Sequence, residues 1–414
     1  MVNKYEVLKK YFGYDGFRSN QEEIIDSLLS GVDTIAILPT GGGKSICFQI
    51  PALIKEGLTI VITPLISLMH NQVSELKKRH IKAEFITSEL DYIQVQNIIK
   101  RVVLKEIKIL YVSPERIENN SFCNIFKTIL ISYVIIDEAH CISIWGNDFR
   151  PSYQGVKVFI NELPNRPTIG AFTATANKKV LSDISFILEL KNENIFKSSF
   201  DRKNLYYQVV NTRNKMMFIT KFLLKNNDLG IIYTITRRDA EILYSKLSAL
   251  GFNVGIYHGG MDAIEKEKSL NSFMNETIKV MVATNAFGMG INKPNIRYVI
   301  NYCIPLSMED LSQQQGRCSR DGEDGICILL FDSNDISVCE YFIKKTNCKD
   351  KKIKSELVKE KHKQLKSVID YATSAKCFRH VLLKYFEENS KVNCYNCSNC
   401  LKNKNNRNIF KPKT

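Results

Sequence analysis

The sequence predicts an α/β fold with two tandem parallel-sheet domains, followed by a small helical module that binds a metal. Apolar, strand-like segments alternate with amphipathic helical segments along residues 34–188, and the same alternation returns along residues 206–331. A glycine-rich turn follows a strand in the first set only. Four cysteines come close together after both sets, at residues 377–400. These three observations separate the chain into its expected parts.

The overall composition is that of a large globular protein. The chain has 414 residues, of which 44% are hydrophobic, so two or three domains are expected. No apolar segment approaches the about 20 residues of a membrane span, and the N-terminus lacks the apolar core of a signal peptide. We therefore expect no membrane partner and a cytoplasmic protein, associated with the nucleoid in a bacterium or nuclear in a eukaryote.

Positive charge is concentrated near the C-terminus. The net charge is +15, and residues 344–414 carry 19 Lys and Arg against 6 Asp and Glu. A basic region of this kind suits a polyanion such as nucleic acid. A solvated, lysine-rich face that aids solubility is the alternative, and charge alone leaves both open.

Residues 3–30 are predicted to be helical, with a polar and aromatic interruption at 12–21. This interruption contains Phe17, Arg18 and Gln21 just before the glycine-rich turn. Such residues could hold a purine base, because a glutamine amide both donates and accepts hydrogen bonds as adenine does. The alternative is an N-terminal cap that packs on the domain.

The glycine-rich turn lies between a strand at 34–38 and a helix that starts at 46–50. Its backbone N–H groups and the positive end of the helix would face an anion, so the sequence predicts a phosphate site. In that site Lys44 would reach the terminal phosphates and Ser45 would ligate Mg²⁺. The expected nucleotide contacts are Thr40, Gly41, Gly42, Gly43, Lys44 and Ser45. Leu38 stands where the strict P-loop pattern has glycine, and a simple tight strand–helix connection is the alternative.

The rest of the first domain follows the same alternation. Strands are predicted at 58–63, 84–87, 107–112, 133–136 and 168–173, with helices at 66–78, 92–104 and 177–188. Parallel sheets of this kind bind ligands at the carboxyl ends of their strands.

Two strand ends in this domain carry polar side chains. Asp137 is placed to hold Mg²⁺ and Glu138 is a candidate base for an attacking water. Thr173 and Thr175 end another strand, where they either bridge the acids and His140 to the neighbouring domain or cap the following helix.

The segment after the acids contains the only tryptophan of the chain. Trp145, Phe149 and Arg150 combine aromatic rings with a guanidinium, a combination that suits single-stranded nucleic acid. The alternative is a hydrophobic loop tucked into the core.

A polar pause at 191–194 and a linker at 198–205 are predicted before the second set of elements. Its strands are expected at 206–210, 230–234, 254–257, 279–283, 298–303 and 326–331, and its helices at 215–225, 238–250 and 264–274. Arg317 and Arg320 are expected on one face of a helix. They would act as arginine fingers on a nucleotide bound by the first domain, or form a surface ion-pair face.

The last part begins with a lysine-rich helix at 353–371. Cys377, Cys394, Cys397 and Cys400 follow with the spacing C-x₁₆-C-x₂-C-x₂-C, which predicts a closed, structural Zn²⁺ site. His380 is a possible substitute ligand, and a redox or disulfide role is the alternative. The other eight cysteines are scattered singly, as expected in a reducing compartment.

Taken together, these residues resemble the motifs of the RecQ family of superfamily 2 DNA helicases, in the family's order and over residues 5–401. Residues 12–21 resemble motif 0, 38–45 motif I, 63–69 motif Ia, 137–140 the DEAH box of motif II, 140–153 the aromatic-rich loop, 173–176 motif III, Arg237 motif IV, 284–293 motif V and 313–322 motif VI.

The resemblance implies RecA-like domains at 1–205 and 206–333, a helical zinc-binding module at 334–401 and a basic, flexible tail at 402–414. It implies that Arg320 is the arginine finger, Arg317 a second γ-phosphate contact and Gln313 a nearby polar partner. ATP, Mg²⁺ and Zn²⁺ are the implied cofactors. A short form is implied as well, because the family's winged-helix and C-terminal accessory domains do not follow the zinc motif.

Several positions depart from the family pattern: Ile144 and Asn147 in the aromatic-rich loop, Gln314 and Ser319 in motif VI, and Asn71 after motif Ia. We expect an ATP-dependent 3′–5′ helicase that acts on single-stranded and forked duplex DNA in repair and recombination. The alternatives are a DNA-stimulated translocase that unwinds weakly and a non-enzymatic DNA-binding scaffold on a helicase fold.

Overall fold

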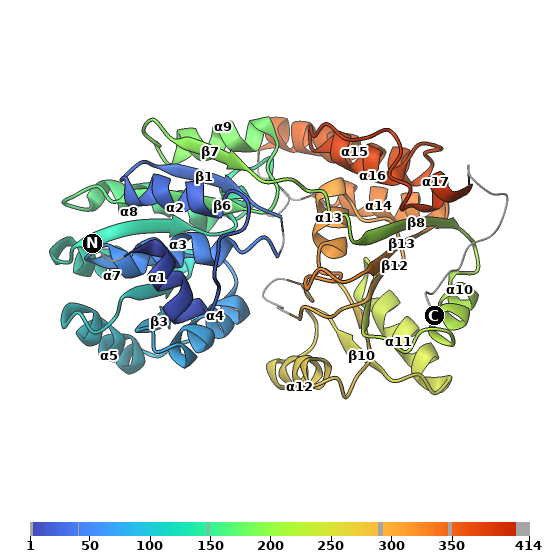
Figure 1. Cartoon of the computed structure of the whole chain (residues 1–414), viewed down its shortest axis with the longest axis horizontal. Helices are drawn as coiled ribbons and strands as arrows, with labels where there is room; N and C mark the ends of the chain where they lie inside the picture. Colours follow the sequence, from blue (N-terminus) through green and yellow to red (C-terminus); the bar gives the residue numbers. More distant parts are fainter. Residues whose placement is uncertain (1–2, 40, 147–148, 289–292, 347–349, 403–414) are drawn as a thin grey trace. The chain divides into compact units, whose positions relative to one another are not determined.

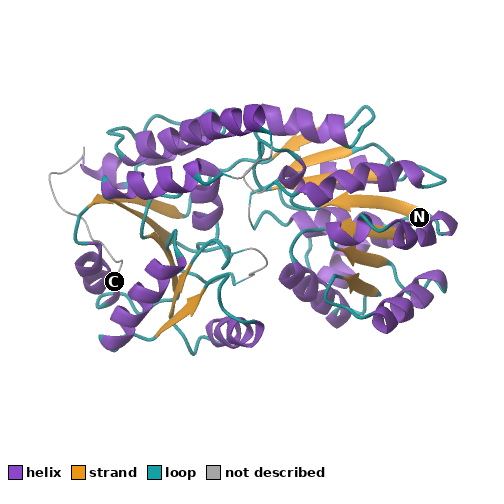
Figure 2. Ribbon diagram, turned by 180° about the vertical axis from the view of Figure 1, so that it is seen from behind, coloured by secondary structure: helices purple, strands orange, loops and turns teal. Residues whose placement is uncertain are grey.

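The computed structural model describes residues 3–39, 41–146, 149–288, 293–346 and 350–402. The chain divides into two compact units, Met1–Ser199 and Phe200–Thr414, and each contains one parallel sheet with helices packed on it (Figures 1 and 2). The predicted α/β class with two parallel sheets and a following helical module is confirmed. Among the described residues, no helix has the length and apolar character that crossing a membrane requires.

The first unit is built on a seven-stranded sheet with the order β3-β4-β2-β5-β6-β1-β7. Its strands are β1 Thr34–Ile37, β2 Leu58–Ile62, β3 Ala83–Ile86, β4 Ile109–Val112, β5 Ile131–Ile136, β6 Thr168–Thr173 and β7 Asn194–Lys197. Every neighbouring pair is parallel, so the carboxyl ends of β1, β2, β5 and β6 lie at one edge. The polar residues that follow these four strands are thereby brought together.

Helices cover both faces of this sheet. They are α1 Lys4–Val7, η1 Leu8–Phe12, α2 Gln21–Leu29, α3 Lys44–Ile54, α4 Ile66–Lys78, α5 Tyr92–Val103, α6 Pro114–Ile117, α7 Asn120–Ile125, η2 Phe126–Thr128, η3 Ala139–Ile142, η4 Pro151–Tyr153, α8 Gln154–Glu162 and α9 Lys178–Ile187. Successive residues of β5 point to opposite faces, so Val134 joins one core cluster and Ile135 the other. A strand buried on both faces is continuously apolar, which explains why β5 was recognisable from its sequence.

One strand departs from the prediction for this unit. The polar segment around 190–205 was expected to interrupt the pattern, but Asn194–Lys197 forms β7 and pairs with β1 at the edge of the sheet. Three of its four side chains are exposed. An edge strand without a buried face has no need of the apolar run on which the prediction relied.

The second unit is built on a six-stranded parallel sheet with the order β10-β11-β9-β12-β13-β8. Its strands are β8 Leu205–Asn211, β9 Gly230–Tyr233, β10 Val254–Tyr257, β11 Val280–Ala283, β12 Tyr298–Asn301 and β13 Gly325–Phe331. Its helices are α10 Lys215–Leu223, α11 Arg237–Ala249, α12 Ala263–Met274, α13 Met308–Gln315, α14 Asn334–Lys344, α15 Lys351–Ala372, α16 Phe378–Tyr385 and α17 Ser398–Lys402.

The last helices among the described residues pack on the second unit. Helices α16 and α17 contact the edge strand β8, while α15 packs against α13 and α14 (Figure 1). Cys397 forms a parallel bridge with Tyr207 of β8, and the cysteine segment therefore covers the open edge of the sheet.

Candidate active site and metal centre

The glycine-rich turn leads from β1 into α3 in the way that a phosphate site requires. Gly41 and Gly43 have positive φ angles of +85° and +80°, which only glycine adopts without strain. Helix α3 begins at Lys44, and no side chain caps its N-terminus. Its first N–H groups therefore point toward the turn as an anion site would need. Thr40, one of the predicted contacts, lies outside the described residues.

The residues predicted to hold a base are attached to this turn. Gln21 is buried and donates to the carbonyls of Gly42 and Gly43, at 3.3 and 3.2 Å, while its own oxygen accepts from the Arg18 N–H at 2.9 Å. The Arg18 guanidinium donates to the Gly41 carbonyl at 2.9 Å. Both side chains thus contact the glycine-rich turn directly. The predicted role in binding a base did not include this contact.

Phe17 of the same segment is half-buried against the core, and its ring centroid lies 5.1 Å from that of Tyr5. The apolar ring of Phe17 and the polar amide of Gln21 therefore lie on one short segment beside the glycine-rich turn.

The predicted acids lie at the carboxyl end of β5, next to the turn. The Lys44 Nζ is 3.4 Å from the Glu138 Oε1, and both side chains are largely buried. Thr63, at the end of the neighbouring β2, donates to the Asp137 Oδ2 at 3.3 Å. Glu138 has a φ of +49°, a costly conformation for a non-glycine residue.

The protonation of Asp137 is shifted by this environment. Burial, the largest cause, and the Glu138 carboxylate raise the pKa of Asp137 to about 6, although Lys44 lowers it. Two buried carboxylates, one of them in contact with Lys44, form a site that a divalent cation would stabilise. Ser45, the other predicted Mg²⁺ ligand, is half-buried in the first turn of α3. These oxygen donors fit magnesium.

His140 connects the acids to the end of β6. Its Nδ1 lies 2.9 Å from the Thr173 Oγ1 and 3.4 Å from the Glu138 Oε2. Of the two hypotheses for the threonines, helix capping does not hold, because Asn177 caps α9 by accepting from the Val180 N–H.

The aromatic segment after the acids is partly folded into the domain. Trp145 packs against the core, and the Lys179 Nζ lies 3.0 Å from its ring centroid. Arg150 donates to the Pro64 carbonyl at 3.2 Å, and Phe149 is half-buried. Residues 147–148 of this segment, including Asn147, lie outside the described residues.

In the second unit, Arg317 and Arg320 do not lie on a helix, and that prediction was wrong. Helix α13 ends at Gln315, and both arginines lie in the turn that follows. Ser319 between them has a φ of +44°, and its N–H donates to the Ile296 carbonyl at 2.7 Å. The helix therefore ends before both arginines, and the sequence did not indicate the left-handed residue between them because serine stands there.

Arg317 is buried beside Gly288. A Cβ on Gly288 would lie 2.8 Å from the Arg317 Nη2, so a larger residue there would displace the guanidinium. The Nε of this guanidinium has no hydrogen-bond partner among the described residues. Burial, the largest cause, and the Arg317 charge together lower the pKa of Arg320 to about 9. Two like-charged guanidinium groups, one buried and one half-buried, favour an anion as their partner.

The glutamines before the arginines have different environments. Gln314 is buried and its amide bridges the side chains of Asn285 and Asn301. It thus fixes the end of β12 to the loop after β11. Gln313, the predicted polar partner, is half-buried. Residues 289–292 of the loop after β11 lie outside the described residues.

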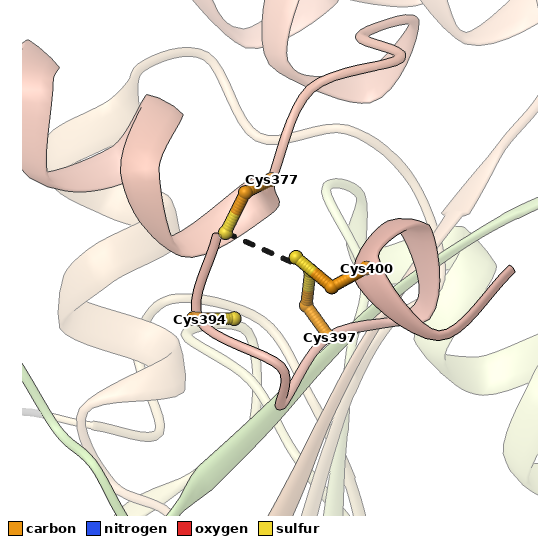
Figure 3. Close-up of side chains that lie close together, drawn as sticks. All are labelled: Cys377, Cys394, Cys397 and Cys400. Carbon is orange, nitrogen blue, oxygen red and sulfur yellow. Dashed lines mark hydrogen bonds between the residues drawn. The ribbon is translucent and has the colours of Figure 1, made fainter. Parts of the chain in front are cut away.

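The four predicted metal ligands converge. The Sγ atoms of Cys377, Cys394, Cys397 and Cys400 all lie within 4.8 Å of one another (Figure 3). The Cys377 and Cys397 sulfurs are 3.9 Å apart. Zinc–sulfur bonds of about 2.3 Å in a tetrahedron require sulfurs about 3.8 Å apart, so this donor set fits zinc.

Hydrogen bonding makes the four thiols unequal. The hydrogen bond from Cys394 is the largest cause that lowers the pKa of Cys397, to about 4, and backbone N–H groups of Cys400 and Phe378 contribute, whereas the same pairing and burial raise the pKa of Cys394. No described cysteine is in a disulfide. His380 is not among the converging donors, and its Nδ1 contacts the Ser390 Oγ at 2.9 Å.

Two residues that serve the acids were not singled out for that role from the sequence. Thr63 contacts Asp137, and the Tyr153 hydroxyl donates to the Asp137 carbonyl at 2.9 Å. The first could have been inferred, since parallel neighbours end at the same edge of a sheet. The second depends on the path of a loop, for which the sequence offers no pattern.

Three family models match successive parts of the chain. The DEAD/DEAH box helicase model matches residues 18–184, the helicase conserved C-terminal domain 214–322, and the RecQ zinc-binding model 333–401. The first two cover the parts of the chain that carry the glycine turn and the arginines, and the third covers the cysteines.

Known proteins resemble nearly the whole chain. The ATP-dependent DNA helicase RecQ of Bacillus subtilis is 42% identical over 95% of this chain and 66% of its own length. The putative ATP-dependent RNA helicase R290 of Acanthamoeba polyphaga mimivirus is 39% identical over 95% of this chain and 71% of its own length. The solved structure of Mss116p bound to single-stranded RNA and AMP-PNP covers 93% of this chain and 89% of its own, with a TM-score of 0.69 at 17% identity, and so shows the fold. The chain spans about two thirds or less of the length of the bacterial curated relatives that it matches.

Proposed function

The chain belongs to the RecQ family of ATP-dependent DNA helicases, and from this we propose that it is itself an ATP-dependent 3′–5′ DNA helicase. It couples ATP hydrolysis to translocation on single-stranded DNA and to duplex unwinding, in DNA repair and recombination. The observation that carries the proposal is the set of contacts at the carboxyl edge of the first sheet. There Lys44 lies 3.4 Å from Glu138, and Thr63 lies 3.3 Å from Asp137.

These residues divide the work of phosphoryl transfer between them. The glycine turn and Lys44 hold the phosphates of ATP, replacing the contact of Lys44 with Glu138. Glu138, released from that contact, orients and deprotonates the attacking water. Ser45 and Asp137 hold Mg²⁺, which neutralises charge on the phosphates when it is bound. Phe17, Arg18 and Gln21 bind the adenine and transmit its presence to the glycine turn through the bonds of Gln21.

The second unit contributes the groups that stabilise charge in the transition state. We assign Arg320 as the arginine finger and Arg317 as a second γ-phosphate contact, with Gln313 as their polar partner. Support comes from the burial of Arg317 and from its unpartnered Nε among the described residues, since a phosphate oxygen would satisfy it.

Single-stranded DNA is proposed to bind beside the acids, at Trp145, Phe149 and Arg150. Arg150 donates to a carbonyl in the loop after β2, while Tyr153 of the same segment donates to the Asp137 carbonyl. A DNA strand that stacks on the aromatic segment would thereby act on the backbone of Asp137, the proposed magnesium ligand. The grip on phosphates would be sensitive to salt and indifferent to sequence.

Hydrolysis of ATP, measured with and without single-stranded DNA, is the first test. Turnover that rises at least tenfold with DNA supports an enzyme, and a parallel reaction with single-stranded RNA reports on the nature of the strand. Forked duplexes with either a 3′ or a 5′ tail then separate the hypotheses. Unwinding from the 3′ tail supports the helicase, whereas stimulated turnover without unwinding favours the translocase. Absence of stimulated turnover would leave only the DNA-binding scaffold.

A further inference from the structure

Residues 200–205 directly follow the boundary between the two units, and side chains of the second unit hold them on two sides. On one side is Arg379, which is 7% exposed and lies two residues after the zinc ligand Cys377. It pairs with the Asp201 carboxylate at 2.5 Å and donates to the carbonyls of Arg202 at 2.7 Å and Leu205 at 2.6 Å.

A second residue of the zinc module reinforces this hold. Asn396, between Cys394 and Cys397, donates to the carbonyls of Lys203 and Leu205, both at 3.2 Å. The ring of Phe200 stacks on Phe386 of the same module at 4.1 Å. The backbone of this segment is therefore fixed by the zinc module.

On the other side, the segment holds the turn that carries the two arginines. The Arg202 Nη2 donates to the carbonyls of Cys318 at 3.0 Å and Ser319 at 2.8 Å. Asn204 adds a bond to the Ser319 carbonyl at 3.1 Å. The Cys318–Ser319 peptide lies between Arg317 and Arg320, so its position sets the position of both guanidinium groups.

This turn has a conformation that needs support. Ser319 is fully buried with a φ of +44°, and two like charges lie on either side of it. The charge of Arg202 is unfavourable to Arg320, because it helps to lower the pKa of Arg320. Arg202 therefore stabilises the turn through its hydrogen bonds and not through charge.

We propose that Arg202 is a positioning residue for ATP hydrolysis, which fixes the Cys318–Ser319 peptide and thereby aims Arg317 and Arg320. The zinc module acts indirectly on the two arginines, because its residue Arg379 holds the backbone of Arg202. The inference rests on the proposed roles of Arg317 and Arg320 in the helicase reaction.

The test compares Arg202→Ala with Lys203→Ala. The second variant also removes one positive charge, but from the neighbouring residue, whose side chain is exposed. ATP turnover is measured at saturating single-stranded DNA. For Arg202→Ala we expect kcat to fall on the order of ten- to hundredfold, as for a misplaced catalytic group, with KM for ATP within about threefold. Zinc content stays at one per chain, Arg202→Lys recovers part of kcat, and Lys203→Ala behaves as the wild type. A kcat for Arg202→Ala within threefold of wild type, or an equal fall in Lys203→Ala, overturns the proposal.

Hydrogen exchange of peptides covering residues 314–322 gives a readout that does not depend on turnover. Faster exchange there in both Arg202→Ala and Arg202→Lys, with unchanged exchange in Lys203→Ala, supports the positioning role. Unchanged exchange in all three variants contradicts it. A wild-type chain without DNA-stimulated turnover would instead refute the proposed function, while the exchange measurement would still decide whether Arg202 holds the turn.

Discussion

Replacement of Cys397 by serine tests the metal centre. The Cys397 side chain is fully buried, its sulfur lies 3.9 Å from that of Cys377, and its backbone bridges Tyr207 at the edge of the second sheet. The change therefore removes one ligand of four, while the backbone bridge to Tyr207 does not depend on the side chain. We expect the variant to bind less than a tenth of the zinc that the wild type holds.

The expected loss of stability is large compared with the stability that the other contacts of the module can supply. Structural zinc contributes apparent free energies of about 10–16 kcal/mol in small domains, comparable to the about 5–15 kcal/mol of a whole folded protein. The other anchors of the module include the hydrogen bonds of Arg379 and Asn396 to residues 201–205 and the stacked pair of Phe200 and Phe386. If only about 4 kcal/mol of the zinc contribution is lost, the melting temperature of the second unit falls by roughly 8–16 °C.

Three measurements on the intact chain follow the change. They are elemental zinc content, thermal melting, and limited proteolysis with cleavage sites mapped within 377–402. Cys303→Ser is the matched control, because Cys303 is half-buried and stands apart from the four ligands. A zinc-free Cys397→Ser protein that melts within 2 °C of the wild type and resists proteolysis would refute a structural metal.

Three further predictions concern the nucleotide site and the contact of the module with α13. Gly43→Ala places a Cβ 2.2 Å from the Gln21 Nε2 at a φ of +80°, so calorimetric titration should show ATP affinity reduced at least tenfold. Gly251→Ala is the control, because Gly251 also has a positive φ but lies in open space; this variant should lose stability and keep its ATP affinity. Because the pKa of Asp137 is raised to about 6, its carboxylate becomes protonated below that pH. The affinity of the protein for Mg²⁺, measured in the presence of ATP, should therefore fall as pH drops through 6. An equal affinity at pH 5.5 and pH 7.5 would contradict this prediction. Burial raises the pKa of Glu309 to about 7, against the hydrogen bond from Tyr385. Folding stability should therefore decrease as pH rises from about 4.5 to 7, by up to about 3 kcal/mol, and Glu309→Gln should remove that dependence in denaturant titrations.

The regular parts of the fold were predictable because their causes are local. Buried parallel strands such as β5 are continuous apolar runs, and the start of α3 is marked by the glycines before it. The polar edge strand Asn194–Lys197 escaped prediction, since its pairing with β1 depends on backbone hydrogen bonds that carry no side-chain pattern.

Site residues were predictable where spacing along the chain determines geometry. The cysteines at 394, 397 and 400 converge because short turns join them, and Cys377 joins them by opening α16. The contact of Arg379 with Arg202 spans 177 residues, and nothing in the local sequence indicates it.

The helix proposed for Arg317 and Arg320 failed for a related reason. The helix ends at Gln315, and the left-handed Ser319 that follows is held by bonds to Ile296 and Asp324 and by the carbonyl contacts of Arg202. Of these partners, Ile296 and Arg202 are distant in the sequence. A serine in a left-handed conformation gives no warning in the sequence, whereas a glycine would have suggested a turn.

The most direct test of the proposed chemistry is the rate of ATP hydrolysis in the presence and absence of single-stranded DNA, for the wild type and for Lys44→Ala. Lys44 is the residue that joins the glycine turn to Glu138, and Lys44→Ala removes this side-chain contact. We predict turnover that DNA stimulates at least tenfold in the wild type and a loss of about a hundredfold or more in Lys44→Ala. Equal turnover in the two proteins, or a wild-type rate that DNA does not change, would contradict the assignment of this site.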